Sequence, residues 1–162
     1  MTENITADAN FEGLRGWLIL VGLGVVLSPL IMAITILPTY SHIFSSGLWS
    51  AVATQTSKAY NPAFAALLIV ELTVNCALIV AWVFAAYLFF SKKKAFPKVF
   101  IGIVAFSLLF IIVDVCTVKA LLPTVHIFDS NTMGQFVRSL IVALIWIPYM
   151  LISRRVQATF VR

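Results

Sequence analysis

Four apolar runs constrain this chain more than any other feature, because each is long enough to cross a lipid bilayer. A membrane-spanning helix needs about 20 consecutive, mainly apolar residues, and the runs cover roughly residues 17–37, 62–90, 97–122 and 135–153. Only 10% of the residues are charged, whereas soluble domains carry about 25%. The sequence therefore predicts an all-α integral membrane bundle of four transmembrane helices, forming a single domain over residues 1–162.

The distribution of basic residues predicts the orientation of these helices, since cytoplasmic loops of membrane proteins are enriched in lysine and arginine. Eight of the eleven lie on one side of the bundle: Arg15, Lys92, Lys93, Lys94, Lys98, Arg154, Arg155 and Arg162. The other three are Lys58, Lys119 and Arg138. We therefore expect both termini and the turn 91–96 in the cytoplasm, with loops 38–61 and 123–134 outside.

The first outer loop contains a short amphipathic pattern. Phe44, Leu48 and Val52 recur at a spacing of four, and Trp49 lies beside them. Apolar residues at this spacing share one face of a helix, so we expect a short helix lying on the membrane surface. In the preceding helix, Gly22 and Gly24 are expected to allow close approach of a neighbouring helix.

A small set of polar residues interrupts the apolar runs. Glu71 and Asn75 are four residues apart within the stretch Ala66–Trp82, so they share one helix face. A carboxylate in hydrocarbon costs roughly 3 kcal/mol or more, so Glu71 needs a partner or a wet cavity. Asp114 and Arg138 are the candidates, because helix rise places all four residues at about 22–28 Å from the cytoplasmic helix ends.

We expect Arg138 to pair with Glu71, Asp114 or both, since its planar guanidinium group can bridge two carboxylates. One arginine against two carboxylates leaves one negative charge, which a proton on either carboxyl group would neutralise. The cluster is interpreted either as an ion network that fixes helix register or as a relay for protons or cations. The structural interpretation is preferred, because one four-helix bundle has little interior for a substrate path and transport would need an oligomer.

Other groups indicate no further chemistry. Lys92, Lys93, Lys94 and Lys98 are possible contacts for anionic lipid headgroups, and they also determine topology. The sequence contains no recognisable catalytic arrangement, and His42, His126 and Asp129 form only a weak metal-binding pattern. We therefore expect no catalytic site, no metal site and no cofactor.

Cys76 and Cys116 lie inside apolar runs, as small core residues do.

Several segments together resemble a known bacterial family, the one catalogued as domain of unknown function 2569 (DUF2569). They are Gly13–Leu20 at the first helix, Tyr60-Asn61-Pro62, the Glu71/Asn75 pair, Ile145–Tyr149, Ser153–Val156 and Thr159-Phe160-Val161. The resemblance covers nearly the whole chain, and it implies a multi-pass protein of the bacterial inner (plasma) membrane. It brings no established activity to any residue.

The expected function is that of a small, non-enzymatic accessory protein that binds a partner. Its expected partners are the lipid bilayer and either another membrane protein or further copies of the chain. Nucleic acid is not an expected partner, because the net charge of +5 comes mostly from segments flanking the apolar runs. The alternative is an oligomeric proton- or ion-coupled transporter or channel that uses Glu71, Asp114 and Arg138.

Overall fold

The fold is all-helical over residues 16–122 and 130–161, which the computed structural model describes. Its helices are α2 (Trp17–Ser45), α3 (Leu48–Ala53), α4 (Pro62–Phe90), α5 (Phe96–Leu121), α6 (Ser130–Ile152) and α7 (Arg154–Thr159). Four of them, α2, α4, α5 and α6, are long and apolar enough to cross a membrane. The structure therefore defines a multi-pass membrane protein.

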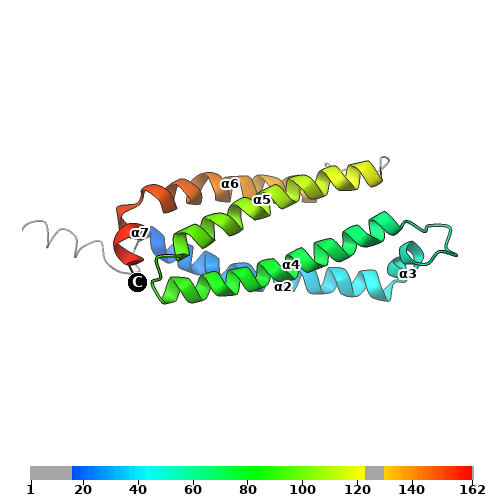
Figure 1. The fold of residues 1–162 in the computed structure, drawn as a ribbon, viewed down its shortest axis with the longest axis horizontal. Coiled ribbons are helices and arrows are strands. Elements are labelled where there is room, and N and C mark those ends of the chain that lie inside the picture. Colours follow the sequence, from blue (N-terminus) through cyan, green and yellow to red (C-terminus); the bar gives the residue numbers. More distant parts are fainter. Residues whose placement is uncertain (1–15, 123–129, 162) are drawn as a thin grey trace, which may run out of the picture.

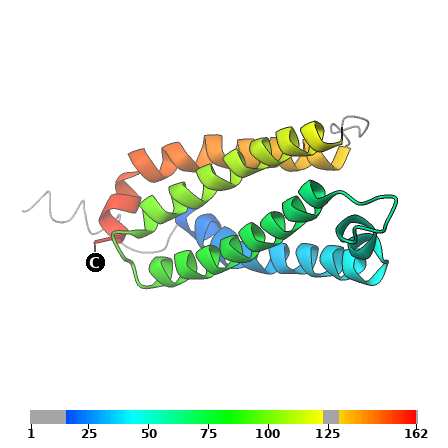
Figure 2. The ribbon, with the colours of Figure 1, turned by 45° about the vertical axis from the view of Figure 1, so that its right-hand side comes forward.

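The four long helices pack mainly as two pairs, α2 with α4 and α5 with α6, which α4 and α5 join (Figure 1). The turn between α4 and α5 and the short helix α7 lie at one end of the bundle, and α3 lies at the other (Figures 1 and 2). We call these the α7 end and the α3 end. The orientation of the two ends relative to the cytoplasm stays a prediction.

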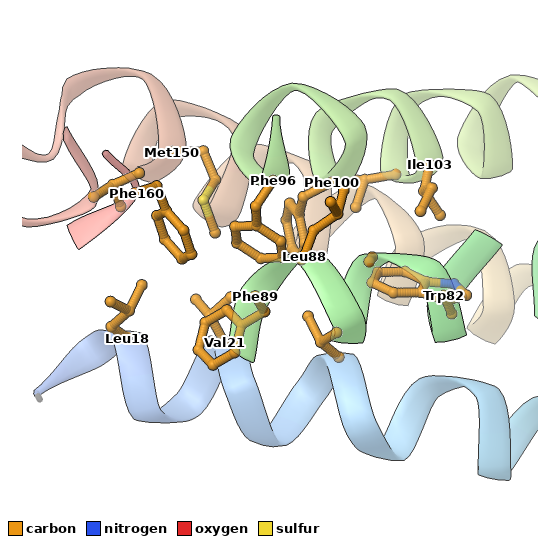
Figure 3. Packing of buried hydrophobic residues seen from close by; sticks show 14 of the residues in the cluster. Leu18, Val21, Trp82, Leu88, Phe89, Phe96, Phe100, Ile103, Met150 and Phe160 are labelled. Atoms are coloured by element: carbon orange, nitrogen blue, oxygen red, sulfur yellow. The ribbon is translucent and has the colours of Figure 1, made fainter. Parts of the chain in front are cut away.

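An aromatic cluster forms the core at the α7 end (Figure 3). The Phe89 ring lies 5.1 Å from the Phe96 ring and 5.7 Å from the Phe160 ring, and Phe96 and Phe160 are stacked at 4.6 Å between centroids. These three side chains come from α4, from α5 and from the residue that follows α7. Because each also touches the others, the cluster holds three parts of the chain together, and Leu18 and Val21 of α2 complete it.

The half of the bundle toward α3 is much more loosely packed. In the described part of the chain, only two of its hydrophobic side chains, Tyr40 and Ala65, are buried. All the other buried hydrophobic residues lie between Leu78 and Val104, in α2 up to Val25, or from Ala143 onward. The α3 half therefore exposes most of its apolar surface to whatever surrounds it in the membrane.

Only one of the two predicted small-residue contacts is present. A Cβ atom added at Gly22 would lie 2.7 Å from Cε1 of Phe89, so α2 can approach α4 here only because residue 22 has no side chain. A Cβ atom added at Gly24 would meet no atom within 4 Å, so the prediction for Gly24 was wrong. The two glycines are two residues apart, about 200° round the helix, and point to different surroundings.

The first spanning helix continues beyond Leu37, where Pro38 was expected to end it. α2 includes both Pro29 and Pro38 and ends at Ser45. Nearby hydroxyl groups bond to backbone carbonyl oxygens: Ser28 Oγ donates to Gly24 O at 2.7 Å, and Thr39 Oγ1 donates to Thr35 O at 2.9 Å. Such local bonds help membrane helices to tolerate proline.

The other helix ends lie close to the ends of the apolar runs. α4 covers the second run, Pro62–Phe90, and its start is capped by Asn61, whose Oδ1 accepts from Phe64 N at 3.0 Å. α5 is displaced by one residue at each end, and α6 begins five residues before the run that predicted it. Most of the predicted loop 123–134, with His126 and Asp129, lies outside the described residues.

The first long connection contains a short helix, whose amphipathic character stays a prediction. α3 contains Leu48, Trp49 and Val52, whereas Phe44 belongs to the end of α2. The Phe44 and Trp49 rings lie 5.5 Å apart, so they link the two helices. The position of α3 on the membrane surface stays a prediction.

The segment after the last spanning helix folds back onto the bundle, which the sequence analysis did not anticipate. α7 buries Val156 and Thr159, and Phe160 follows them into the core. The spacing of four between Val156 and Phe160 is the helical signal that could have revealed it. Arg154 and Arg155 at the start of α7 were interpreted only as basic residues that indicate the orientation of the helices.

We predict that Gly22→Ala lowers the stability of the protein by about 1–3 kcal/mol, the usual cost of overpacking a core. Phe89 cannot move aside easily, because Phe96 and Phe160 enclose it. The matched control is Gly24→Ala, which adds the same methyl group to the same helix without a contact. Thermal unfolding in mild detergent measures both, and equal melting temperatures would contradict the proposed α2–α4 contact.

Candidate functional site

The candidate site begins with a contact between α2 and α4 in the loosely packed α3 half. The Tyr40 hydroxyl donates a hydrogen bond to Glu71 Oε2 at 3.3 Å. Tyr40 is buried, and Glu71 is partly buried. Sequence reasoning missed Tyr40, because it placed this residue in the loop after Pro38. The continuation of α2 brings the tyrosine level with Glu71.

α5 adds a second carboxyl group at the same place. The Asp114 side chain lies within hydrogen-bonding reach of Glu71, and Asn75 lies beside the Tyr40 hydroxyl. The Oδ1 atom of Asp114 is enclosed and has no hydrogen-bond partner among the described residues. We call Tyr40, Glu71, Asn75 and Asp114 the carboxyl cluster. Three of its four members are residues that the sequence analysis had placed together.

The structure does not bring Arg138 into this cluster. Its side chain is exposed on α6 and makes no ion pair with Glu71 or Asp114 in the described parts of the chain. α6 buries Ala143 and Met150, which are seven residues apart and share a face. Arg138 is five residues from Ala143, about 140° round the helix, so it points away from that face. A buried Glu/Asn/Asp/Arg network inside one copy of the chain is thus not what the structure shows.

The carboxyl cluster has more acceptors than donors. Two carboxyl groups this close repel one another when both are charged, unless a cation, a donor or a proton lies between them. The donors in the cluster are the Tyr40 hydroxyl, which serves Glu71, and the side-chain amide of Asn75, which lies near Tyr40. The Asp114 Oδ1 atom is left over. Chemically, the cluster is suited to accept a hydrogen bond or a positive charge from a group outside it.

The predicted headgroup-binding lysines lie at the opposite end of the bundle. Lys92 and Lys93 close the end of α4, where their amides donate to Phe89 O at 3.1 Å and Leu88 O at 3.0 Å. Lys92 adopts a left-handed conformation with φ 51°, which a glycine usually supplies at such a position. Lys93, Lys94 and Lys98 are exposed, and their contact with lipid stays a prediction.

Cysteine and metal chemistry add nothing to the site. Cys76 and Cys116 are free and exposed, which corrects the expectation that both are small core residues. Among the described residues, no three histidine, cysteine, aspartate or glutamate side chains gather as a metal site would require. His126 and Asp129 fall outside that part of the chain.

The fold defines the protein as a small multi-pass membrane protein. The model of the family described as Protein of unknown function (DUF2569) matches residues 11–161. The match covers nearly the whole chain, so the protein belongs to this family, as its sequence motifs suggested. No curated protein and no solved structure matches the chain.

We predict that Tyr40→Phe lowers stability by about 0.6–1.5 kcal/mol, the usual net value of one such hydrogen bond. Tyr87→Phe is the matched control, because Tyr87 is exposed on α4. A double-mutant cycle with Glu71→Met should return a coupling energy of the same size. Unfolding in mixed detergents measures all four proteins, and a coupling energy near zero would show that the bond does not stabilise the fold.

Proposed function

We propose that this protein is a non-enzymatic accessory protein that binds a helix of another membrane protein through its α3 half. The carrying observation is that Glu71 and Asp114 are only partly buried, so a partner can reach these carboxyl groups, and that Asp114 Oδ1 has no donor among the described residues. A helix that presents a lysine, arginine, asparagine or glutamine side chain would supply the missing donor. Polar contacts of this kind join helices in lipid, where water cannot replace them.

The loose packing of the α3 half supports this proposal. Large apolar side chains such as Ile34, Leu37 and Ile69 are exposed there. Lipid can cover such side chains, but it offers no hydrogen-bond donor to a carboxyl group in the hydrocarbon. A partner helix would satisfy both requirements, because its apolar face would pack on α2 and α4 while one polar side chain reached the carboxyl cluster.

The expected location fits the same proposal. We propose that the chain lies in the bacterial inner membrane with the α7 end toward the cytoplasm, because the basic residues are concentrated there. The carboxyl cluster would then lie in the outer half of the bilayer. The partner helix would carry its donor at this depth, and the α3 connection would be available for contacts outside the membrane.

We predict that Glu71→Gln combined with Asp114→Asn removes the bound partner. The measurement is gentle extraction at native abundance, followed by the particle mass and the identity and stoichiometry of what co-purifies. The matched control is Thr73→Val, which removes a polar group two residues from Glu71. The Thr73 hydroxyl is exposed and already donates to Ile69 O of its own helix at 2.7 Å, so the partner should stay bound.

Two outcomes would overturn the proposal. A stoichiometric partner that remains on the double variant would show that the carboxyl cluster does not hold it. A particle that contains only this chain, in the wild type as well as the variants, would remove the need for any foreign partner. Melting temperatures of the purified variants serve as the check that both are folded.

A second candidate, an oligomeric proton- or ion-coupled transporter or channel, is favoured by the exposure of Arg138. An arginine exposed within a membrane helix is costly and needs a partner. Arg138 lies within about 6 Å of the depth of Glu71 by helix rise. In this form, Arg138 of one copy pairs with the carboxyl cluster of the next, and head-to-tail contacts of this kind close into rings.

Mixing two variants tests the oligomer directly. Arg138→Gln and the Glu71→Gln/Asp114→Asn variant should each be monomeric, because each lacks one side of the contact. Mixed together they should form a dimer, since one intact arginine meets one intact carboxyl cluster. Particle masses in detergent or nanodiscs measure this. Failure of the mixture to associate would exclude the contact, and a wild-type oligomer would justify measuring proton flux into vesicles.

A further inference from the structure

A hollow at the α7 end of the bundle has the lining of a phosphate-binding site. It has a volume of about 260 Å³ and lies between the start of α2, the end of α6 and the start of α7. The residues around it are Gly16, Trp17, Tyr149, Ser153, Arg154 and Arg155. At roughly 30 Å³ per water molecule in the liquid, this space equals about nine waters. A phosphate with one small substituent fits, whereas an entire phospholipid does not.

The groups around the hollow are suited to an anion. Arg154 and Arg155 contribute two guanidinium groups, whose planar arrangement of N–H donors matches a phosphate and can bond it in two places at once. The Ser153 hydroxyl accepts no capping bond from α7, and its O–H group is a donor of the kind that an anion accepts from. None of the six lining residues carries a carboxylate.

The two arginines are held by the fold and do not lie on a loose tail. Val156, the residue after Arg155, is 1% exposed, and Phe160 is stacked on Phe96 at 4.6 Å. α7 is therefore fixed to the core at the α7 end. A site whose side chains start from a fixed backbone loses less conformational entropy when it binds an ion.

Gly16 brings the other wall of the hollow close to the arginines. Its φ of 61° and ψ of −136° form a conformation that residues with side chains rarely adopt. A Cβ atom at this position would lie 3.4 Å from Nη1 of Arg155 and 3.9 Å from its Cζ. The absence of a side chain at Gly16 thus leaves open the space beside the Arg155 guanidinium group.

Aromatic rings border the hollow and indicate the depth at which it lies. The Trp17 and Trp146 rings meet edge to face at 6.3 Å, and the Trp146 and Tyr149 rings meet at 5.7 Å. Tryptophan and tyrosine concentrate where lipid headgroups meet the hydrocarbon. Basic pockets between membrane helices near this level bind anionic headgroups.

We propose that this hollow binds a phosphate group, with Arg154, Arg155 and Ser153 as its donors and Trp17 and Tyr149 beside its substituent. The phosphate can belong to an anionic phospholipid, such as phosphatidylglycerol, or to a free phosphate ion. The site is separate from the carboxyl cluster, which lies toward the other end of the bundle. It also differs from the lysine-rich turn between α4 and α5, whose cations lie on an exposed connection.

The test releases the full chain from nanodiscs of mixed phosphatidylglycerol and phosphatidylcholine. Native mass spectrometry then measures how much phosphatidylglycerol the chain retains. Arg154→Gln/Arg155→Gln should lower the retained phosphatidylglycerol by at least about tenfold, since two charge-assisted bonds are lost. The control, compared with Arg154→Gln alone, is Lys58→Gln, which removes one positive charge from an exposed residue in the connection between α3 and α4, away from the hollow. The control should retain the lipid as the wild type does.

Addition of millimolar inorganic phosphate distinguishes the two sources. If phosphate leaves the lipid in place, the site takes a headgroup; if phosphate displaces it, the site takes the free ion, and either result supports a phosphate site. Equal retention of phosphatidylglycerol by the wild type and the Arg154→Gln/Arg155→Gln variant would overturn the proposal. An equal loss in the lysine control would also overturn it, because charge alone would then explain binding. Arg154→Gln alone changes an exposed side chain, and it repeats the test if the double variant is unstable.

Discussion

The stacking of Phe160 on Phe96, with Phe89 against both, is the interaction on which the rest of the structure depends. In a membrane, apolar side chains gain little by leaving lipid for protein, so close packing and ring contacts determine where helices meet. Here they meet at one end. Gly22 lets α2 reach the Phe89 ring, and α7 closes the same cluster from beyond α6. The α3 half receives no comparable contact, which is why its few polar groups dominate its chemistry.

The two ends of the bundle therefore differ in chemical character. The α7 end combines a dense aromatic core with cations around it, and its hollow is lined by arginines held on a fixed helix. The α3 half combines exposed apolar surface with carboxyl groups and one phenol. One end is suited to an anion at the membrane surface, whereas the other is suited to a donor within the hydrocarbon. The helices that connect them carry little polar chemistry of their own.

Much of the fold could be predicted from the sequence, because helices that cross a membrane must be long and apolar. The same reasoning grouped Glu71, Asn75 and Asp114 because each interrupts such a run at a similar depth, and their role as a site stays a prediction. It failed for Tyr40, because a proline ends most helices in water but is tolerated in lipid. The reasoning also failed for Arg138. The sequence gives the depth of a residue along its helix, but the direction of its side chain depends on which helix face packs against the bundle. The spacing of Val156 and Phe160 indicates one helix face, but the core that this face joins is formed by α2, α4 and α5.

The position of Phe160 also has a consequence for how the protein is made. Residues are synthesised in order, and early segments fold first. α2, α4, α5 and α6 can each enter the membrane as soon as they emerge, yet the core that joins them lacks Phe160 until residues beyond α6 have been synthesised. Until then, the Phe89 and Phe96 rings lack the contacts that Phe160 makes with both of them. Insertion and assembly are thus separate steps in the biogenesis of this protein, and the second waits for a short segment that never crosses the bilayer.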